Sequence, residues 1–538
     1  MKHSDVAARE PASTRMADRL SAAWDGSARR WLPLALGAAA ALGFAPTYLA
    51  PLTIAALALL SIGIARAPTL ASAFWRGWGF GVGVFTIGNG WIATAFTFQS
   101  NMPAWLGWIA VPALALYLAV WPGFAALFAR ALVGRSERVT LPFALVFGGA
   151  WALGEWLRSW VFSGFAWNPI AAIAPAAAAP AALVGSYGQS GLIVLLSAAL
   201  ALLAWDRRAA LTTLAGTAAL WGASALTLAL LPMTAPGPHV TVVQPLIEQG
   251  EKWDPAVREA NMARLLRQSG RPAALPAATP RLLLWPEAGI TDYIESGYRI
   301  DYYDIAPQWA RAEATAALGP ADWLLSGAPR LEVDRSGTRV IGARNAVFAL
   351  SQGGRLHPLR YDKAHLVPYG EYLPMRSVLA PLGLARLTPG DFDFWPGSGP
   401  HTLAWPLTGG VGVAVCYEII FSGRVVDRTH RPRWLFNPSN DAWFGPAGPP
   451  QHLAQARLRA IEEGLPVIRS TPTGISAVID ASGRVLASVP LGRAGRIDMA
   501  VPGARAPTPF ARLGNVLTLL FAAALLIGGA IASRRRRR

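Results

Sequence analysis

The run VGVAVCYE (411–418) has the pattern of a buried β-strand that ends on a reactive side chain. It consists of small and β-branched apolar residues, which suit strands covered on both faces. Six similar runs lie on either side of it, at VTVVQP (240–245), RLLLWPE (281–287), WLLSGAP (323–329), NAVFAL (345–350), RWLFNPS (433–439) and ISAVID (475–480). Helical periodicity intervenes at 255–268 and 451–464. This alternation predicts an α/β layered domain over residues 239–505, with helices covering the strands.

The rest of the chain has the composition of a membrane protein. Of its 538 residues, 53% are hydrophobic and 15% are charged, and the mean hydropathy is +0.34. A helix needs about 20 apolar residues to cross a bilayer. Eight apolar runs predict eight transmembrane helices, near 31–49, 51–65, 74–98, 104–132, 139–157, 191–205, 209–231 and 514–532. The Pro- and Ala-rich stretch 164–190 is expected to form a re-entrant or surface segment.

Basic residues predict which side of the membrane each part faces. Lys and Arg recur at every second connection, from the N-terminal segment to the run Arg534–Arg538, whereas the connection 99–103 carries no charge. Short connections rich in Lys and Arg stay in the cytoplasm. The first run is not expected to be a cleaved signal peptide, because its basic leader is long and a second run follows at once. We therefore expect a cytoplasmic segment at 1–30, seven membrane helices within 31–238, a periplasmic catalytic domain at 239–505, and an eighth helix with a basic cytoplasmic tail at 506–538.

Charge and cysteine content narrow the classes of function. The formal net charge is +17, but much of the excess lies beside apolar runs, which favours topology signals and anionic lipid over nucleic acid. Cys416 is the only cysteine, so an intramolecular disulfide is impossible. The seven histidines show no paired ligand spacing, and no metal site is expected. A lone cysteine is more often a small buried hydrophobe than a nucleophile, so its neighbours decide the interpretation.

Three predicted strand ends each present one reactive side chain. Glu287 ends RLLLWPE, Lys363 follows RYD, and Cys416 ends VGVAVC. Such groups gather beyond the strand ends of α/β sheets. A thiol needs a base to become a nucleophile, and a carboxylate with an apolar approach can be that base. A nearby lysine favours the thiolate and stabilises an oxyanion. The alternatives are a solvated strand-end acid for Glu287, and a surface lysine or partner of Asp362 for Lys363.

These residues and their flanking segments resemble a known family. The order W-P-E, K-x-H-L-V-P-x-G-E-Y, C-Y-E and N-D-A-W-F-G, followed by Q-H and A-R-x-R-A, resembles the nitrilase superfamily. Four segments are similar to its membrane branch, the apolipoprotein N-acyltransferases: HLVPYGEYLP (365–374), SNDAWFG (439–445), GEWLRSW (154–160) and FSGFAWN (162–168). The resemblance implies an αββα sandwich that faces the periplasm, mounted on eight helices in the bacterial inner membrane.

The resemblance also implies an activity and its partners. A fatty acyl chain would pass from a phospholipid donor to the α-amino group of an apolipoprotein that carries an N-terminal S-diacylglyceryl-cysteine, through a thioester on Cys416. No dissociable cofactor is expected, and the protein is expected to be a monomer in contact with membrane lipid.

Residue by residue, Cys416 is similar to the family's nucleophile, Glu287 to its general base and Lys363 to its oxyanion-stabilising lysine. The resemblance adds a supporting set: Glu371, Tyr417 and Glu418 within the active site, and Trp253 at the substrate entrance. Glu371 could instead only orient Lys363, and Glu418 could be a structural ion-pair partner. The loop Asn440–Phe444 is expected to shape the surroundings of the nucleophile. Two departures from the family pattern put local loop shape in doubt: Pro245, and STPTG at 470–474.

Other interpretations remain open on the sequence. A Cys-His enzyme would use His365 as its base. A membrane-bound amidase or nitrile hydrolase could carry the same three residues, although a soluble substrate would leave the membrane part unexplained. A transporter or scaffold predicts charged or helix-breaking residues deep in several spans, and these runs show few. The sequence does not indicate which phospholipid or acyl chain is preferred.

Overall fold

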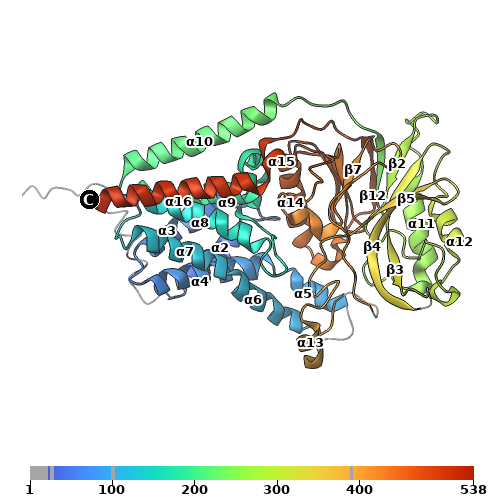
Figure 1. The fold of residues 1–538 in the computed structure, drawn as a ribbon, viewed down its shortest axis with the longest axis horizontal. Helices are drawn as coiled ribbons and strands as arrows, with labels where there is room; N and C mark the ends of the chain where they lie inside the picture. The colour runs from blue at the N-terminus through green and yellow to red at the C-terminus, as the bar shows by residue number, and fades with distance from the viewer. Residues whose placement is uncertain are drawn as a thin grey trace, which may run out of the picture.

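The structure is a computed structural model that describes residues 30–98, 103–337, 339–387 and 392–537, together with Ala22 and Trp24. A helical unit and a unit of two β-sheets lie end to end (Figure 1). Most of the expected cytoplasmic segment 1–30 lies outside the described residues.

The helical unit is built from strongly apolar segments. Its helices are α2 (Leu32–Ala41), α3 (Ala50–Ala65), α4 (Leu70–Gly88), α5 (Ile92–Ala95), α6 (Leu106–Leu118), α7 (Val120–Val133), α8 (Leu141–Arg158), α9 (Ala181–Leu202), α10 (Arg207–Leu230) and α16 (Asn515–Arg537). Trp108, Leu226, Leu230 and Ile527 point outward and are more than half exposed. Exposed apolar side chains of this kind suit a lipid environment.

Among the described helices, four are long and apolar enough to cross a membrane: Leu106–Val133, Ala181–Leu202, Arg207–Leu230 and Asn515–Arg536. A fifth arises if Leu70–Gly88 and Ile92–Phe98, bent by 49° at their break, count as one span. Two of the predicted runs form shorter helices, α2 with 10 residues and α3 with 16. Every predicted run thus overlaps a helix, while eight crossings remain a prediction.

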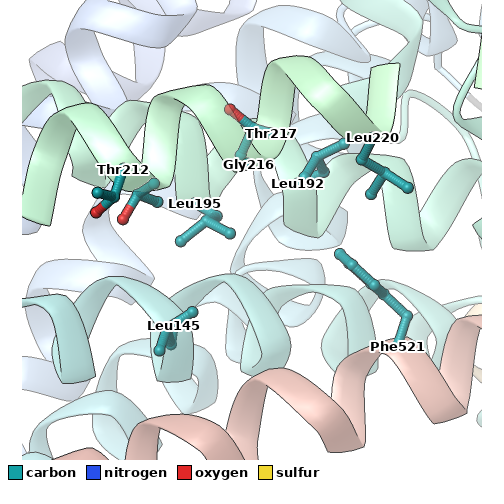
Figure 2. A pocket seen from close by; sticks show the side chains of 9 residues that line it. Leu145, Leu192, Leu195, Thr212, Gly216, Thr217, Leu220 and Phe521 are labelled. Atoms are coloured by element: carbon teal, nitrogen blue, oxygen red, sulfur yellow. The ribbon is translucent and has the colours of Figure 1, made fainter. Parts of the chain in front are cut away.

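Helix α10 stands apart from the rest of the bundle (Figure 1). A cavity of about 300 Å³ separates its middle from α8, α9 and α16, and apolar and threonine side chains line it (Figure 2). Polar contacts hold the helix near its start and along its second half, and Arg505 donates to Leu228 O at its C-terminal end. Arg536 lies 3.6 Å from Asp206, and Trp221 Nε1 donates to Ala177 O at 2.6 Å.

The described strands of the second unit form two six-stranded sheets. The order in the first is β12-β1-β2-β3-β4-β5, from β12 (Gly495–Ala500), β1 (His239–Gln244), β2 (Arg281–Leu284), β3 (Trp323–Val333), β4 (Val340–Ser351) and β5 (Arg355–Asp362). The order in the second is β11-β10-β9-β8-β7-β6, from β11 (Val485–Val489), β10 (Ser476–Ile479), β9 (Val467–Ser470), β8 (Trp434–Pro438), β7 (Val411–Val413) and β6 (Thr402–Leu403). In each sheet three central strands run parallel and the outer strands antiparallel.

The sheets pack face to face between layers of helices. Their inner faces share one apolar core, to which Val242 and Leu284 contribute from one sheet and Val413 and Phe436 from the other. Helices α11 (Arg258–Ser269) and α12 (Pro307–Ala314) cover the first sheet on the far side from the helical unit (Figure 1). Helix α14 (Gly448–Glu463) lies between the second sheet and the helical unit (Figure 1). The predicted α/β domain with covered sheets is confirmed.

Aromatic and polar side chains join the two units. Phe444 of the sheet unit packs against Trp91 and Trp167 of the helical unit, with ring centroids 4.7 and 5.3 Å apart. Trp167 Nε1 donates to Gln451 Oε1 at 2.8 Å. The stretch 164–190, expected to be re-entrant or superficial, is largely buried at this junction. Glu155 accepts a hydrogen bond from Ile170 N at 3.0 Å and Arg158 donates to Trp167 O at 2.8 Å, so both brace its first part.

Candidate active site

The site forms where strand ends from both sheets meet. Glu287 lies three residues beyond β2 and Lys363 directly follows β5, both in the first sheet. Cys416 lies three residues beyond β7 of the second sheet and begins the 3-10 helix η8 (Cys416–Ile420). All three side chains are buried, with exposures of 7%, 1% and 4%. The structure therefore brings together the three residues that the strand ends predicted.

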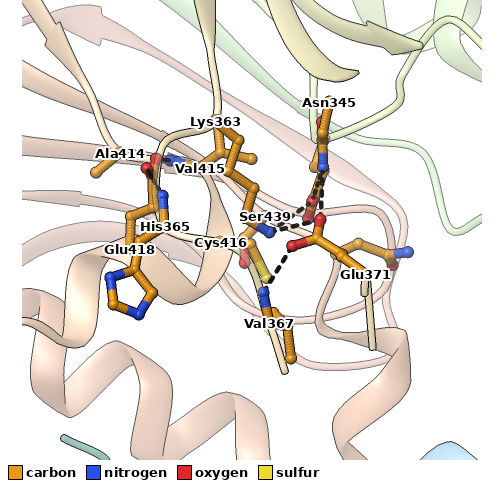
Figure 3. Close-up of polar contacts among 12 residues, drawn as sticks. Asn345, Lys363, His365, Val367, Glu371, Ala414, Val415, Cys416, Glu418 and Ser439 are labelled. Carbon is orange, nitrogen blue, oxygen red and sulfur yellow. Dashed lines mark hydrogen bonds and ion pairs between the residues drawn. The ribbon is translucent and has the colours of Figure 1, made fainter. Parts of the chain in front are cut away.

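A lysine between two carboxylates forms the centre of the site. Lys363 Nζ donates to Glu371 Oε1 at 2.9 Å (Figure 3). The same Nζ lies 3.6 Å from Glu287 Oε1. Asn345 Nδ2 bridges the same oxygens, donating to Glu287 at 2.6 Å and to Glu371 at 3.3 Å. Burial alone would lower the pKa of Lys363, but the charges of Glu371 and Glu287 outweigh it and raise that pKa. Lys363 is therefore a permanent ammonium near neutral pH.

The two carboxylates differ in how fully they are bonded. Glu371 uses both oxygens, because Oε2 accepts from Val367 N at 2.8 Å while Oε1 faces Lys363. Within the described residues, Oε2 of Glu287 is buried and meets no hydrogen-bond donor. A buried polar atom without a partner requires an explanation. The absence of a donor is explained if this oxygen takes a proton from a substrate or from a neighbouring side chain.

Cys416 occupies a strained turn in an apolar environment. Its φ of 50° lies in the left-handed region, which residues other than glycine seldom adopt unless their surroundings enforce it. Burial raises the pKa of its thiol to about 12, and the Glu287 carboxylate adds to the rise while Lys363 opposes it. The resting sulfur is therefore protonated at neutral pH, and a base must take its proton before it can attack a carbonyl.

Glu418 joins the segment that follows β5, which carries Lys363, to the segment that follows β7, which carries Cys416. Its Oε1 accepts from Ala364 N at 2.8 Å and His365 N at 3.0 Å, and its Oε2 accepts from Val415 N at 2.7 Å. The Tyr361 hydroxyl donates to both oxygens, at 3.0 and 3.1 Å. Burial raises the pKa of Glu418, and its amide donors oppose that rise. Its contacts are those of a structural clamp, made through hydrogen bonds rather than through the ion pair considered from the sequence.

The remaining predicted residues lie around this centre. Tyr417 is buried and its hydroxyl donates to Gly164 O of the helical unit at 3.3 Å. His365 directs Nε2 at Ser163 O, 3.2 Å away, and packs on the Phe421 ring at 3.9 Å. Burial lowers the pKa of His365 to about 4, so its ring is neutral and turned toward the helical unit. Trp253 is 44% exposed between β1 and η5 (Pro255–Val257).

A second buried cluster supports the nucleophile from behind. His452 of α14 places Nε2 3.0 Å from Cys416 O and Nδ1 3.0 Å from Asp441 Oδ1. Because a carbonyl oxygen only accepts, Nε2 carries a hydrogen and donates it to Cys416 O. Arg469 Nη2 donates to Asp441 Oδ1 at 2.6 Å and lies 3.0 Å from His452 Nδ1. The sequence prediction missed His452 and Arg469. His452 lies in the Q-H pair of the family pattern, whereas no predicted strand covers Arg469.

No metal-binding arrangement is present in the part of the chain that the structure describes, where no group of three or more His, Cys, Asp or Glu could hold an ion. The ionisable groups around Cys416 are instead arranged to move a proton and to stabilise negative charge. That is the chemistry of acyl transfer through a thiol.

Comparison with known proteins identifies the family. Residues 36–199 match the apolipoprotein N-acyltransferase N-terminal domain, and residues 239–505 match the carbon-nitrogen hydrolase domain. The chain is 36% identical over 535 residues to an apolipoprotein N-acyltransferase of Caulobacter vibrioides, covering 95% of each chain. It is 34% identical over 534 residues to that of Bradyrhizobium diazoefficiens, covering 95% of this chain and 96% of the relative. The chain belongs to the apolipoprotein N-acyltransferase family.

The two departures from the pattern of apolipoprotein N-acyltransferases lie against each other beside β1. Gln244 Nε2 donates to Gly474 O at 3.1 Å, and Gln244 Oε1 accepts from Ser476 N at 2.8 Å. Leu246 N donates to Pro472 O at 2.9 Å. Hydrogen bonds from Gln244 and Leu246 therefore hold the STPTG loop, and Pro245 lies between these two residues.

Proposed function

We propose that this protein moves a fatty acyl chain from a phospholipid to the α-amino group of the S-diacylglyceryl-cysteine at the N-terminus of apolipoproteins. Relatives that match 95% of the chain carry the name apolipoprotein N-acyltransferase. The observation that carries the proposal is the site around the chain's sole thiol. There a buried lysine lies beside a carboxylate that, within the described residues, keeps one oxygen free.

The first step forms a thioester on Cys416. The free Oε2 of Glu287 takes the thiol proton as sulfur attacks the ester carbonyl of the phospholipid. The Lys363 ammonium stabilises the oxyanion, and Glu371 and Asn345 hold that ammonium in place. As the carbon–oxygen bond breaks, Glu287 returns the proton to the leaving oxygen and a lysophospholipid departs.

The second step transfers the acyl group to nitrogen. The α-amine of the apolipoprotein attacks the thioester, and Glu287 takes a proton from that amine. The carbon–sulfur bond breaks, and the proton returns to the Cys416 sulfur. The burial of Cys416 and Lys363 keeps the site apolar, which strengthens the interaction of the ammonium with the oxyanion and limits access of water to the thioester.

We also propose the placement of the two units. Eight crossings of the inner membrane, with residues 1–30 and the tail of 506–538 in the cytoplasm, would carry the catalytic unit 239–505 on the periplasmic side. Alkaline phosphatase fused after residue 235 is then active, and fused after the tail it is inactive. The opposite pattern of activities would refute this orientation and the location of the site with it.

The decisive test follows the acyl group. Purified protein incubated with phospholipid alone accumulates an acyl adduct on Cys416, detected by mass spectrometry, because a transferase holds its thioester until the amine arrives. Addition of a peptide with an N-terminal diacylglyceryl-cysteine discharges the acyl group onto the peptide amine. Cys416→Ala keeps lipid binding and forms no adduct. Fatty-acid release at a steady rate that the peptide does not change would instead indicate a hydrolase and sink the proposal.

A further inference from the structure

A second buried lysine lies beside the proposed base, and the chemistry described so far does not use it. Lys252 precedes Trp253 in the connection after β1, and it is 6% exposed. Its Nζ donates to the backbone oxygen of Glu287 at 2.7 Å. A lysine is seldom buried so fully unless its charge is matched. The negative groups near the Lys252 ammonium therefore indicate what this side chain does in the site.

The carboxylates of Glu287 and Glu371 are matched one for one by ammonium groups only when Lys252 is counted, whereas Glu418 is held by backbone amides and the Tyr361 hydroxyl. Two buried carboxylates, Glu287 and Glu371, share the single ammonium of Lys363. If Lys252 carried no charge, these two carboxylates would hold an excess negative charge in an apolar environment, which is energetically unfavourable. Of the two, Glu287 is the less fully bonded to donors. The charge of Lys252 therefore lies beside the carboxylate with fewer donors, which is the proposed base.

The groups that face Lys252 leave its charge directed at the site. The Glu287 carboxylate is the partner whose negative charge acts on it, and the Cys416 sulfur joins it once the thiol has lost its proton. On α11, Arg258 lines the same small cavity, but Asp292 and Glu313 already neutralise it at 2.8 and 2.6 Å. The cavity, about 20 Å³ between Lys252, Pro286 and Ala288, has room for about one water molecule. Solvent therefore screens the lysine little.

Burial lowers the pKa of Lys252 to about 8, while the Glu287 carboxylate and, once ionised, the Cys416 sulfur work against that decrease. The side chain is therefore mostly charged at neutral pH and loses its charge as the pH rises through about 8. An effect of this charge on the site should disappear over the same range, which gives the inference a signature in pH.

We propose that Lys252 is a positioning residue that fixes the backbone of Glu287 and, by its charge, stabilises the negative charge that Glu287 and Cys416 share while the thiol proton is transferred. This inference rests on the proposed role of Glu287 as base. Because Lys252 adjoins Trp253, the same contact ties the connection that carries this tryptophan to the base.

The test uses the single thiol of the chain as its own reporter. The rate of Cys416 alkylation by iodoacetamide is measured against pH in the full-length protein, without any lipid substrate. Lys252→Gln keeps a donor for Glu287 O but removes the charge, whereas Lys252→Arg keeps both. Arg264→Met is the matched control, because Arg264 holds the same connection from outside, donating to Glu251 Oε2 at 2.7 Å.

We expect Cys416 of the Lys252→Gln variant to alkylate about tenfold more slowly at pH 7, because a rise of about one unit in the pKa of the thiol makes the thiolate about tenfold scarcer at that pH. The change of slope near pH 8 in the wild type should disappear. Lys252→Arg and Arg264→Met should follow the wild type. A Lys252→Gln profile equal to that of the wild type would overturn the inference, as would equal slowing in Gln and Arg variants, which would indicate packing alone.

This experiment is separable from the test of the proposed function. If phospholipid leaves no adduct on Cys416 but the Lys252 variants shift alkylation as expected, the acyl-transfer proposal fails and the positioning role stands. If the adduct forms but the alkylation rate does not depend on the charge at residue 252, the acyl-transfer proposal stands and the positioning role of Lys252 fails. Circular dichroism of each variant checks that it is folded. If the Gln variant does not fold, Lys252→Met in its place removes the same charge.

Discussion

Two buried polar clusters flank Cys416, and they are built from similar residue types with opposite degrees of saturation. In the base cluster, formed by Glu287, Lys363, Glu371 and Asn345, one carboxylate oxygen has no donor within the described residues. In the support cluster, formed by Asp441, His452 and Arg469, both carboxylate oxygens accept hydrogen bonds. One cluster thus keeps a vacancy for a proton, and the other has none.

The difference indicates that the base cluster serves catalysis and that the support cluster serves stability. A carboxylate whose two oxygens are both bonded holds its neighbours rigidly, and here the network around Asp441 holds the backbone oxygen of Cys416 through His452. An unsaturated carboxylate is unfavourable for folding, and folded proteins tolerate it mainly where it performs a function. The strength of the Asp441–Arg469 interaction shows in the low pKa of Asp441: burial would raise it, but Arg469 and His452 outweigh that effect. Substitutions in the two clusters should therefore fail in different ways.

The largest effect is expected at the unsaturated carboxylate. Glu287→Gln should reduce Cys416 acylation by at least about a hundredfold, because an amide cannot accept the thiol proton. The isosteric change should leave the unfolding temperature close to that of the wild type. Mass spectrometry of the adduct and a thermal melt measure the two quantities. An active Glu287→Gln enzyme would show that the vacancy in the base cluster has no catalytic role.

The support cluster should fail in stability instead. Asp441→Asn leaves the fully buried Arg469 without its counter-charge, which should destabilise the protein by about 3–5 kcal/mol. Thermal unfolding of the detergent-solubilised protein measures this loss. Asp301→Asn is the matched control, since its pair with Arg299 is exposed on both sides and contributes little. Equal melting temperatures for the two variants would contradict the contrast between the clusters.

A third, smaller effect sharpens the division within the base cluster. Glu371→Gln loosens Lys363 without removing the proton acceptor, so turnover should slow by about ten- to a hundredfold while the Cys416 adduct still forms. Single-turnover acylation against lipopeptide turnover separates these quantities. Complete loss of the adduct, equal to that in Glu287→Gln, would mean that the two carboxylates act as one unit.

The smallest effect is expected at His365, the base of the alternative Cys-His mechanism. Its burial, which lowers its pKa to about 4, keeps the ring neutral above about pH 5. His365→Gln retains a donor for Ser163 O and should change acylation by no more than about twofold, with no change in the shape of the rate profile between pH 6 and 8. If the wild-type acylation rate rose with pH near 6.5 and His365→Gln abolished that rise, His365 would be the base instead.

Sequence patterns were most informative where chemistry follows a strand. Glu287, Lys363 and Cys416 could be predicted because each ends or follows a β-type run, and strand ends converge in a layered sheet. His452 and Lys252 could not, since nothing in their spacing indicates that a helix and a connection bring them to Cys416 and Glu287. Helix α9 begins at Ala181, ten residues before the predicted run, because its first turns are too polar to read as a span.

The contact between His452 and Trp167, with ring centroids 5.1 Å apart, makes the two units difficult to separate. The imidazole that holds the nucleophile's carbonyl leans on an indole from the other unit, and Phe444 fills the space beside both. A gene fragment encoding only the two sheets would therefore leave His452, which holds the carbonyl of the nucleophile, without the indole on which it packs. A variant that lacks the helical unit would therefore need other side chains to pack against His452 in place of Trp167.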